Sequence, residues 1–278
     1  MKRFLILAAL LTFTVSNSQS LVPEVSVNEL TIGKSIEIKS TVLEENRILN
    51  IYLPPSYQID TLKSYPVIYL LDGSKDEDFI HITGIVQFGS FSWINMIPES
   101  IVVGIANTDR KKDFTYPSNN KLDQNEFPTS GESKKFIEFL EKEALPFVNN
   151  KFRTTQTNTL IGQSLGGLLG TEILFKTPHL FGKYIIVSPS LWWDDESLLG
   201  EEIKDFDSSK QIYIAVGKEG EVMERTAEEL FKKLDTLKKL ESKVHFDFLE
   251  DKSHGDALHQ AVYNAFETFS NKTGNNNG

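Results

Sequence analysis

The sequence predicts an α/β protein with a mostly parallel, doubly wound sheet and an antiparallel pair of strands at its start. Two observations support this fold class. Short, nearly continuous apolar runs recur along the chain, as in strands buried on both faces, and helical patterns separate them. Before these runs, apolar and polar residues alternate, as in antiparallel strands with one exposed face. The chain of 278 residues suits one such domain, which we expect at 21–270.

The first twenty residues have the pattern of a signal peptide. Lys2 and Arg3 form a basic start, residues 4–15 are apolar, and the small polar residues 16–20 offer cleavage sites. The apolar run is shorter than the roughly 20 residues that a membrane-spanning helix needs. We therefore expect an exported protein, periplasmic or extracellular in a bacterium, with no membrane span after cleavage.

The elements follow one another in the order that this fold class requires. The antiparallel pair is expected at 35–43 and 48–55, where polar and apolar residues alternate. The apolar runs of the parallel strands lie at 65–73, 100–107, 157–162, 182–190, 211–217 and 243–250. Helical periodicity predicts helices at 133–148, 165–176, 222–240 and 256–269. Strands that alternate with helices favour a parallel sheet with helices on both faces.

Two segments lie outside this alternation. Residues 109–131 are polar and are predicted to form a long loop, which in a compact domain is usually functional or mobile. Residues 271–278, rich in Asn and Gly, are expected to be a disordered tail. The chain has no internal repeat and no Pro/Gly-rich linker, so it favours a single domain.

Composition excludes several classes of function. The formal net charge is −10, and it becomes 27 − 39 = −12 once Lys2 and Arg3 are removed. Such an acidic chain has no electrostatic footprint for nucleic acid or for an anionic membrane surface, so neither is an expected partner. The sequence has no cysteine, which excludes disulfides, thiol chemistry and lipid attachment through cysteine. Composition leaves the oligomeric state open.

A serine boxed by glycines lies between the strand expected at 157–162 and the helix expected at 165–176. The sequence G-Q-S-L-G-G around Ser164 fits the nucleophile-elbow pattern Gly-x-Ser-x-Gly. At such a turn the hydroxyl projects above the sheet, and Gly162 and Gly166 keep bulk away from it. The helix that begins at Leu165 offers a backbone N–H and a positive dipole end to a developing oxyanion. The pattern predicts that Ser164 is a nucleophile; an idle serine in a tight turn is the alternative.

A nucleophilic serine needs a base, and His254 is the predicted one. In hydrolases with this motif, the acid and then the histidine follow the serine along the chain. Of the four histidines after Ser164, His254 alone lies in the loop after the last strand, at the edge where the elbow lies. His179 precedes a strand, His245 lies inside one, and His259 falls in the final helix. The spacing of His254 and His259 matches no tetrahedral metal site, so no metal is expected.

The acid of the triad is less clearly marked. Glu219 and Glu221 both follow the strand at 211–217, and either can hold the imidazole in the correct tautomer. We predict Glu219, because Glu221 stands at an expected helix start, where the helix dipole alone favours a negative charge. Asp194 and Asp195, after the preceding strand, remain alternatives, and all four carboxylates are otherwise ordinary loop charges.

Several segments together resemble a known family. The sequences VIYLLDG, GIANTDRKKDFTYP, LIGQSLGGLLGTEILFKTPHLFGKYIIVSPSLWW and SHGDALHQAV are similar to the putative esterase family, which includes esterase D and the enterochelin (ferric-siderophore) esterases. The resemblance extends from about residue 35 to 270. It implies an α/β-hydrolase fold and a Ser-His-acid apparatus that needs no cofactor. The family's serine and histidine fall on Ser164 and His254, and its second oxyanion N–H falls on Ser74, beside that of Leu165.

The resemblance also bears on the substrate pocket. Siderophore esterases carry basic residues near the pocket, and Arg110, with Lys111 and Lys112, is the basic group available here. Trp192 and Trp193 follow a predicted strand end. They are interpreted either as walls of an aromatic acyl or catechol pocket or as ordinary core and rim residues.

The sequence thus predicts a secreted serine esterase that hydrolyses a small-molecule carboxylic ester through an acyl-enzyme. Acyl transfer of the mycolyltransferase type is an alternative, because it differs only in the acceptor that reaches the acyl-enzyme. A non-catalytic binding module on a hydrolase scaffold is a further alternative, disfavoured because both Ser164 and His254 are present. The substrate stays open among a siderophore triester, an acetylated or feruloylated sugar and a short acyl ester.

Overall fold

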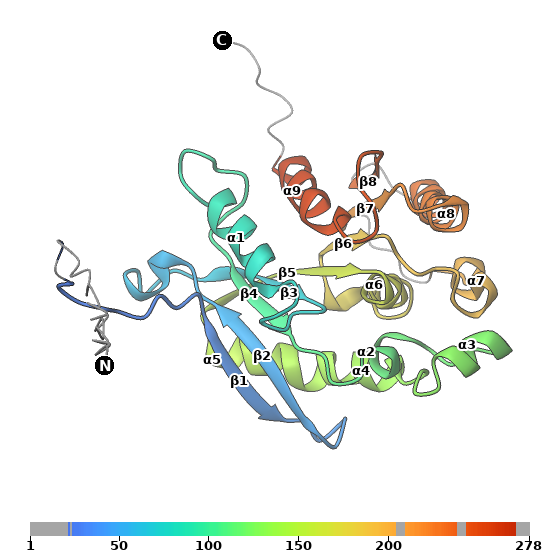
Figure 1. The fold of residues 1–278 in the computed structure, drawn as a ribbon, viewed down its shortest axis with the longest axis horizontal. Coiled ribbons are helices and arrows are strands. Elements are labelled where there is room, and N and C mark those ends of the chain that lie inside the picture. Colours follow the sequence, from blue (N-terminus) through green and yellow to red (C-terminus); the bar gives the residue numbers. More distant parts are fainter. Residues whose placement is uncertain (1–21, 23, 204–208, 238–242, 271–278) are drawn as a thin grey trace, which may run out of the picture. The chain divides into compact units, whose positions relative to one another are not determined.

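The structure is a computed structural model that describes residues 22, 24–203, 209–237 and 243–270 (Figure 1). The chain divides into two units, Met1–Thr31 and Ile32–Gly278. The described part of the first unit forms neither helix nor strand. The predicted signal peptide at 1–20 and the predicted tail at 271–278 lie outside the described residues.

A single mixed sheet forms the centre of the second unit. Its strands, within the described residues, run in the order β1-β2-β4-β3-β5-β6-β7-β8. The pairs β1–β2 and β2–β4 are antiparallel, and all other neighbours are parallel. The strands are β1 (Lys34–Lys39), β2 (Asn46–Tyr52), β3 (Tyr65–Leu70), β4 (Ile101–Ile105), β5 (Thr154–Gln163), β6 (Lys183–Val187), β7 (Gln211–Gly217) and β8 (Lys243–Leu249). The predicted fold class, mostly parallel with an antiparallel N-terminal pair, is confirmed.

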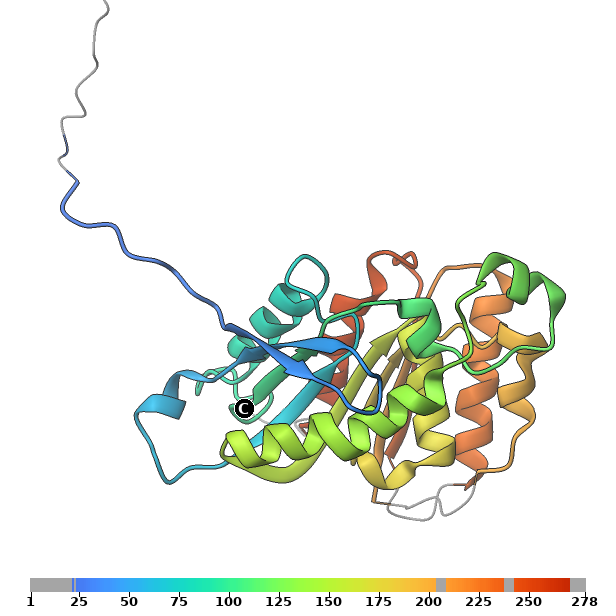
Figure 2. The ribbon, with the colours of Figure 1, turned by 90° about the horizontal axis from the view of Figure 1, so that it is seen from below.

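Helices cover both faces of this sheet, as Figures 1 and 2 show. One face packs against α1 and α9, and the other packs against α4, α5, α6 and α8. The helices are α1 (Phe79–Gly89), α2 (Arg110–Phe114), α3 (Lys121–Glu126), α4 (Ser133–Phe139), α5 (Leu145–Lys151), α6 (Leu165–Lys176), α7 (Trp193–Gly200), α8 (Glu221–Leu237) and α9 (Ala257–Phe269). Short 3-10 turns, η1 (Pro55–Gln58) and η3 (Pro178–Leu180), and a π-helical turn, η2 (Leu140–Ala144), complete the set.

The apolar runs in the sequence form the core because successive side chains of a strand point to opposite faces. In β3, Val67 and Tyr69 contact the core beneath α4–α6, whereas Ile68 and Leu70 contact the core beneath α1 and α9. All four side chains are at least 96% buried. A strand buried on both faces therefore reads as a continuous apolar run, as the sequence pattern indicated.

Two predictions about the segment 109–151 are corrected by the structure. The loop predicted at 109–131 contains α2 and α3, whose first turns are capped by the side chains of Asp109 and Asn120. Both are preferred N-cap residues, a local signal that the polar composition hid. The helix predicted at 133–148 is α4, η2 and α5 in succession, with Pro146 in the first turn of α5. Proline has no N–H to donate to the carbonyl one α-helical turn before it. This missing hydrogen bond accounts for the wider, π-helical turn of η2 just before α5.

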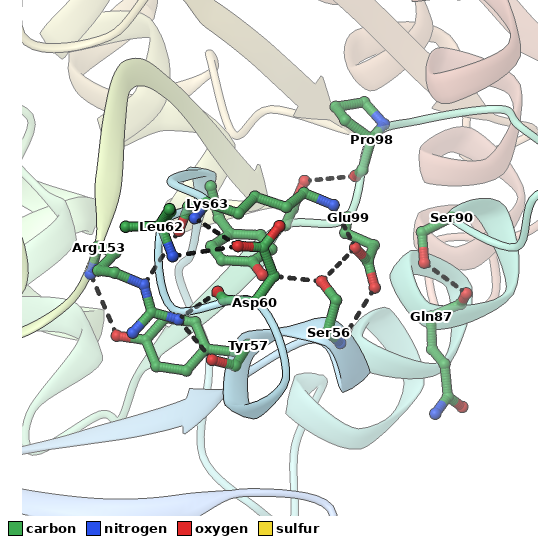
Figure 3. Close-up of polar contacts among 12 residues, drawn as sticks. Ser56, Tyr57, Asp60, Leu62, Lys63, Gln87, Ser90, Pro98, Glu99 and Arg153 are labelled. Atoms are coloured by element: carbon green, nitrogen blue, oxygen red, sulfur yellow. Dashed lines mark hydrogen bonds and ion pairs between the residues drawn. The ribbon is translucent and has the colours of Figure 1, made fainter.

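A polar cluster closes the amino ends of β3, β4 and β5 (Figure 3). Glu99, which precedes β4, accepts hydrogen bonds from the hydroxyl of Ser56 at 2.5 Å and from the ammonium of Lys63 at 2.5 Å. The guanidinium of Arg153 donates to the carbonyls of Lys63 and Asp60 at 3.0 and 3.2 Å. The cluster ties the segment between β2 and β3 to the sheet.

Candidate active site

The turn between β5 and α6 holds Ser164 in a strained conformation. Its backbone has φ 59° and ψ −119°, a region that costs a non-glycine residue of order 1–3 kcal/mol. The Ser164 N–H donates to the carbonyl of Val187 at 3.0 Å, and its carbonyl accepts from the N–H of Leu168 at 2.9 Å and of Ser190 at 3.0 Å. The turn is thus fixed by β6 on one side and by the first turn of α6 on the other.

The glycines of the motif allow close contact of main chains. A Cβ atom on Gly162 would lie 2.4 Å from the carbonyl oxygen of Gly166, and one on Gly167 would lie 2.9 Å from Cα of Pro189. No side chain fits at either position without moving backbone. The sequence-based reason, that glycines keep bulk away from the serine, is therefore incomplete: they let α6 begin directly against β5 and the end of β6.

Glu219 and His254 meet above the carboxyl ends of β7 and β8. Oε2 of Glu219 lies 2.5 Å from Nδ1 of His254, a hydrogen bond whose donor is the imidazole. The Glu219 side chain is 3% exposed and that of His254 is 48% exposed. A buried carboxylate on one ring nitrogen leaves Nε2 of the accessible ring to act on a substrate.

The second oxygen of Glu219 is also held. Oε1 accepts from the hydroxyl of Ser188 at 2.5 Å and from the N–H of Gly217 at 2.9 Å. Burial alone would raise the pKa of the Glu219 carboxyl, but the hydrogen bonds from His254, Ser188 and Gly217 outweigh it and hold this pKa below its usual value. The group is therefore an anion at neutral pH.

The loop that carries His254 is fastened to the nucleophile turn. Nε2 of Gln163, the residue before Ser164, donates to the carbonyl of His254 at 2.5 Å. The N–H of Lys218 donates to the carbonyl of Lys252 at 2.6 Å, which binds the same loop to the end of β7. The structure thus brings Ser164, His254 and Glu219 to one edge of the sheet: His254 contacts Glu219 directly, and Gln163 links the His254 loop to the residue before Ser164. The Ser164 hydroxyl itself lies 3.3 Å from that of Ser190.

The alternative acids lie elsewhere. Glu221 is exposed at the first residue of α8. Asp194 accepts from the Asn119 N–H at 2.5 Å, and Asp195 accepts from the side chain of Asn120 at 2.7 Å. Asp194 and Asp195 therefore hold the segment between α2 and α3 and do not contact His254.

The other histidines after Ser164 have separate surroundings. Nε2 of His179 lies 2.8 Å from Oε1 of the Glu141 carboxylate. His245 lies inside β8. His259 lies in α9, with its Nε2 2.8 Å from Nδ1 of His81 in α1, and its pKa is lowered by burial and by the charge of His81. None of these contacts involves Glu219.

The two predicted oxyanion donors differ in their surroundings. Leu165 is the first residue of α6, so its N–H belongs to the positive end of that helix. The N–H of Ser74 donates to Oε2 of Glu77 at 3.2 Å, as in a capping box. The side chain of Asn107 donates to Oε1 of the same carboxylate at 3.0 Å. The Ser74 N–H is thus occupied by the Glu77 carboxylate in this structure.

The side chain of Arg110, a predicted pocket residue, is hydrogen-bonded within the protein. Its Nε and Nη2 donate to the two oxygens of Asp72 at 2.6 and 3.0 Å, and Nη2 also donates to the carbonyl of Gln163 at 3.2 Å. Asp72 has φ 55° at the end of β3. Arg110 thus joins the loop of Ser74 to the nucleophile turn, a brace that sequence reasoning missed together with Asp72 and Gln163.

The two tryptophans also separate. Trp193 is fully buried, and its indole N–H donates to the carbonyl of Tyr116 at 2.8 Å, which favours the interpretation as a core residue. Trp192 is partly exposed and packs against the same core, with its ring 6.0 Å from that of Phe127. Core and rim packing accounts for both contacts.

Two negative findings apply to the described part of the chain. Its His, Asp and Glu side chains form no group of three arranged to hold a metal ion. No helix within it is both long enough and apolar enough to cross a membrane.

The strand order, the strained serine between β5 and α6, and the paired carboxylate and imidazole after β7 and β8 define an α/β-hydrolase class of protein. A solved structure of an IroE-like serine hydrolase from Shewanella oneidensis has a TM-score of 0.75 and 30% identity, covering 85% of this chain and 79% of its own. The family model described as "Putative esterase" matches residues 40–267. The chain belongs to this family of esterases.

Two further relatives carry siderophore names. Ferri-bacillibactin esterase BesA of Bacillus subtilis (strain 168) is 30% identical over 186 residues, 62% of this chain and 64% of the relative. The matched part thus spans slightly less than two thirds of that protein's length. The siderophore hydrolase EstA from Aspergillus nidulans has a TM-score of 0.71 over 90% of this chain and 100% of its own, at 19% identity, a level that shows the shared fold alone.

Proposed function

We propose that this chain is a serine carboxylic ester hydrolase that acts through an acyl-enzyme, with Ser164 as nucleophile, His254 as base and Glu219 as acid. The observation that carries the proposal is the 2.5 Å contact between Glu219 and His254, on a loop that Gln163 fastens beside the strained Ser164. The first contact orients the base, and the second holds its loop beside the nucleophile.

The reaction follows from these positions. Oγ of Ser164 attacks the ester carbonyl carbon while Nε2 of His254 takes the hydroxyl proton, and Glu219 stabilises the resulting imidazolium. The N–H groups of Leu165 and Ser74 bind the oxyanion, the second after Glu77 has left it. His254 then gives its proton to the leaving alcohol. Water attacks the acyl-enzyme with the same base, which releases the acid and restores Ser164.

A phosphonate ester tests the nucleophile directly. We expect a p-nitrophenyl alkylphosphonate to modify Ser164 alone, and Ser164→Ala to lower the hydrolysis of p-nitrophenyl butyrate by about 10⁴-fold or more. The matched control is Ser190→Ala, because its hydroxyl lies only 3.3 Å from that of Ser164. Label found on peptides of the Ser164→Ala protein, or no label on the wild type, contradicts the assignment; the second result favours a binding module.

The substrate proposal is an ester of the siderophore class, supported by the name of the Bacillus subtilis relative, with an acyl-sugar ester as the alternative. The basic groups expected near the pocket are engaged: Arg110 with Asp72, Lys111 with the ring of Phe127, and Lys112 with Glu132 at 3.7 Å. A feruloyl or acetyl sugar, which carries no strong charge, therefore needs testing beside a ferric triscatecholate. Acyl transfer predicts an acylated sugar as product, whereas hydrolysis predicts the free acid.

We also propose that the protein is exported, on the basic and apolar pattern of residues 1–20. Fractionation of cells that produce the full chain should recover a shortened protein outside the cytoplasm. A full-length protein confined to the cytoplasm contradicts export.

A further inference from the structure

A cavity of about 710 Å³ lies away from the candidate active site. Its lining comes from β7, β8, α9 and the segment before β4 that contains Trp93. None of Ser164, His254 and Glu219 lines it. This volume is in the range of sites that bind small molecules, which typically combine aromatic walls with a few polar groups.

One side of the cavity is aromatic. Trp93 is 76% exposed, an unusual position for so large an apolar side chain, and it stacks on Phe91 with ring centres 4.7 Å apart. Tyr263 of α9 adds a further aromatic ring to the lining, whereas the ring of Phe246, another lining residue, stacks on Phe231 of α8. Aromatic faces carry negative electrostatic potential and so favour a cation or a C–H face over an anion.

Most hydrogen-bond donors of the other side are already used within the protein. The hydroxyl of Tyr213 donates to Oδ2 of Asp247, and the amide of Asn264 donates to the same oxygen at 2.9 Å. The hydroxyls of Thr268 and Ser270 donate to main-chain carbonyls of α9 at 2.8 and 2.7 Å. Tyr213, Thr268 and Ser270 therefore leave acceptor oxygens for a ligand, and the amide of Asn264 keeps one N–H.

The charged side chains of the lining are negative, so they favour a cation, as the acceptor oxygens do. Asp247 and Glu267 line the cavity, and no lysine or arginine does. Neither carboxylate forms an ion pair with another residue in the described ranges. Burial first, and then the contact with Asp247, raises the pKa of Tyr213, so its hydroxyl keeps its proton and stays a donor to Asp247. His245 also lines the cavity, on β8.

We propose that this cavity binds a small organic cation, an ammonium group on an apolar body, with the charge facing Asp247 and Glu267 and the body against Trp93. An ammonium supplies donors or positive C–H groups and no acceptors, which complements a lining of acceptors and aromatic faces. The site is independent of the esterase proposal, because the two share no residue.

The test compares ligands of one shape and different charge. Choline and 3,3-dimethylbutan-1-ol differ only in the central N⁺ or C atom, and 3,3-dimethylbutanoate supplies the anion. Titrations of the full chain, followed by ligand NMR and by tryptophan fluorescence, should give choline a Kd at least about tenfold below that of the alcohol, with no binding of the anion. Equal Kd values for choline and the alcohol overturn the proposal.

Variants locate the site. Asp247→Asn and Glu267→Gln each keep the shape and remove a charge, and each should raise the Kd of choline about fivefold or more. Trp93→Ala should do the same, whereas Glu228→Gln, which removes an exposed carboxylate on α8, should not. All variants should hydrolyse p-nitrophenyl butyrate like the wild type, which shows that they fold. Choline binding that none of the three cavity variants weakens places the ligand elsewhere and overturns the proposal.

A second arm distinguishes the source of the cation. Nα-acetyl-Nε-trimethyllysine amide presents the same group on a peptide backbone. Binding weaker than that of choline supports a free small molecule, whereas tighter binding contradicts it and assigns the cavity to a lysine side chain of a partner.

Discussion

Glu219 and Glu99 are held by the same kinds of donor at opposite ends of the parallel strands. Glu219 follows the carboxyl end of β7, and Glu99 precedes the amino end of β4. Each carboxylate accepts from a serine hydroxyl at 2.5 Å, from a main-chain N–H, and from a side-chain nitrogen at 2.5 Å. For both, hydrogen bonds outweigh the effect of burial and lower the pKa. The local chemistry of the two carboxylates is nearly the same.

The nitrogen partner makes the difference. Glu99 binds the ammonium of Lys63, and that hydrogen bond raises the pKa of Lys63, so the proton stays on the lysine at neutral pH. Glu219 binds Nδ1 of His254, and an imidazole, unlike an ammonium, has a second nitrogen that can take a proton from one group and give it to another. A carboxylate in this arrangement becomes useful for catalysis only when its partner can pass a proton on.

The backbone also differs between the two ends. At the carboxyl end, β3, β5 and β6 are each followed within two residues by a non-glycine residue of positive φ, namely Asp72, Ser164 and Ser188. At the amino end, Ser56 and Lys63, the residues that hold Glu99, have no such conformation. Strain of this kind persists where surrounding contacts enforce it and where a side chain must be aimed. The following variants test the comparison by changing matched residues at both ends.

The largest difference is expected for the nitrogen partners. His254→Ala should lower kcat by about as much as Ser164→Ala, because nucleophile and base act as a unit. Lys63→Ala, its counterpart at the amino end, should leave kcat within about twofold of wild type. Steady-state kinetics on p-nitrophenyl butyrate measures both. His259→Ala is the matched histidine control, and a dead His259→Ala beside an active His254→Ala contradicts the assigned base.

The carboxylates should rank in the same way. Glu219→Gln should lower kcat by at least about a hundredfold, since it removes the charge that stabilises the imidazolium. Glu99→Gln should be nearly silent in the same assay, and Glu221→Gln should change kcat by less than about fivefold. A silent Glu219→Gln points to a Ser-His pair that works alone, whereas a strong effect of Glu221→Gln transfers the acid to Glu221.

The serines give a smaller contrast. Ser188→Ala should lower kcat about tenfold with little change in KM, because Oε1 of Glu219 loses a buried donor and the carboxylate is less firmly held. Ser56→Ala, which removes the corresponding hydroxyl from Glu99, should leave kcat unchanged. Ser188→Gly also lacks the hydroxyl but suits the positive φ of 44°, so an equal loss of kcat in that variant attributes the effect to the hydrogen bond and not to backbone strain. Equal effects of Ser188→Ala and Ser56→Ala contradict the comparison.

The sequence predicts what is local along the chain. Each parallel strand is an apolar run with a recognisable end, so Ser164, Glu219 and His254 could be assigned to the carboxyl edge from their positions after such runs. The ranking of Glu219 over Glu221 rested on the helix dipole, and Glu221 does lie at the first residue of α8.

What the sequence does not predict depends on how separate strands come into register. Ser188 reaches Glu219 because β6 and β7 are neighbours, and Arg110 reaches Asp72 and Gln163 because β3 lies between β4 and β5. No pattern within a single segment encodes these pairings. Trp193 was ambiguous for a similar reason, since its burial depends on Tyr116 and on Phe127 from a distant segment.

The smallest expected effect is on stability, and both carboxylates should show it with the same sign. A carboxyl whose native pKa lies below the ordinary value of about 4.3 stabilises the fold above that pH and loses this contribution as the pH falls through the native pKa.

At pH 5, Glu219→Gln and Glu99→Gln should therefore each lower the free energy of unfolding by about 1 kcal/mol. The loss should be larger at Glu219, because its side chain is 3% exposed and that of Glu99 is 21% exposed. Between pH 5 and pH 3 the difference from wild type should shrink for both, because the wild-type carboxyls also become neutral. Urea unfolding of each protein at several pH values measures this, with Glu228→Gln on exposed α8 as a control whose difference should stay small. A difference that grows on acidification at Glu219 but shrinks at Glu99 contradicts the view that the two carboxylates are held alike and differ only in their partners.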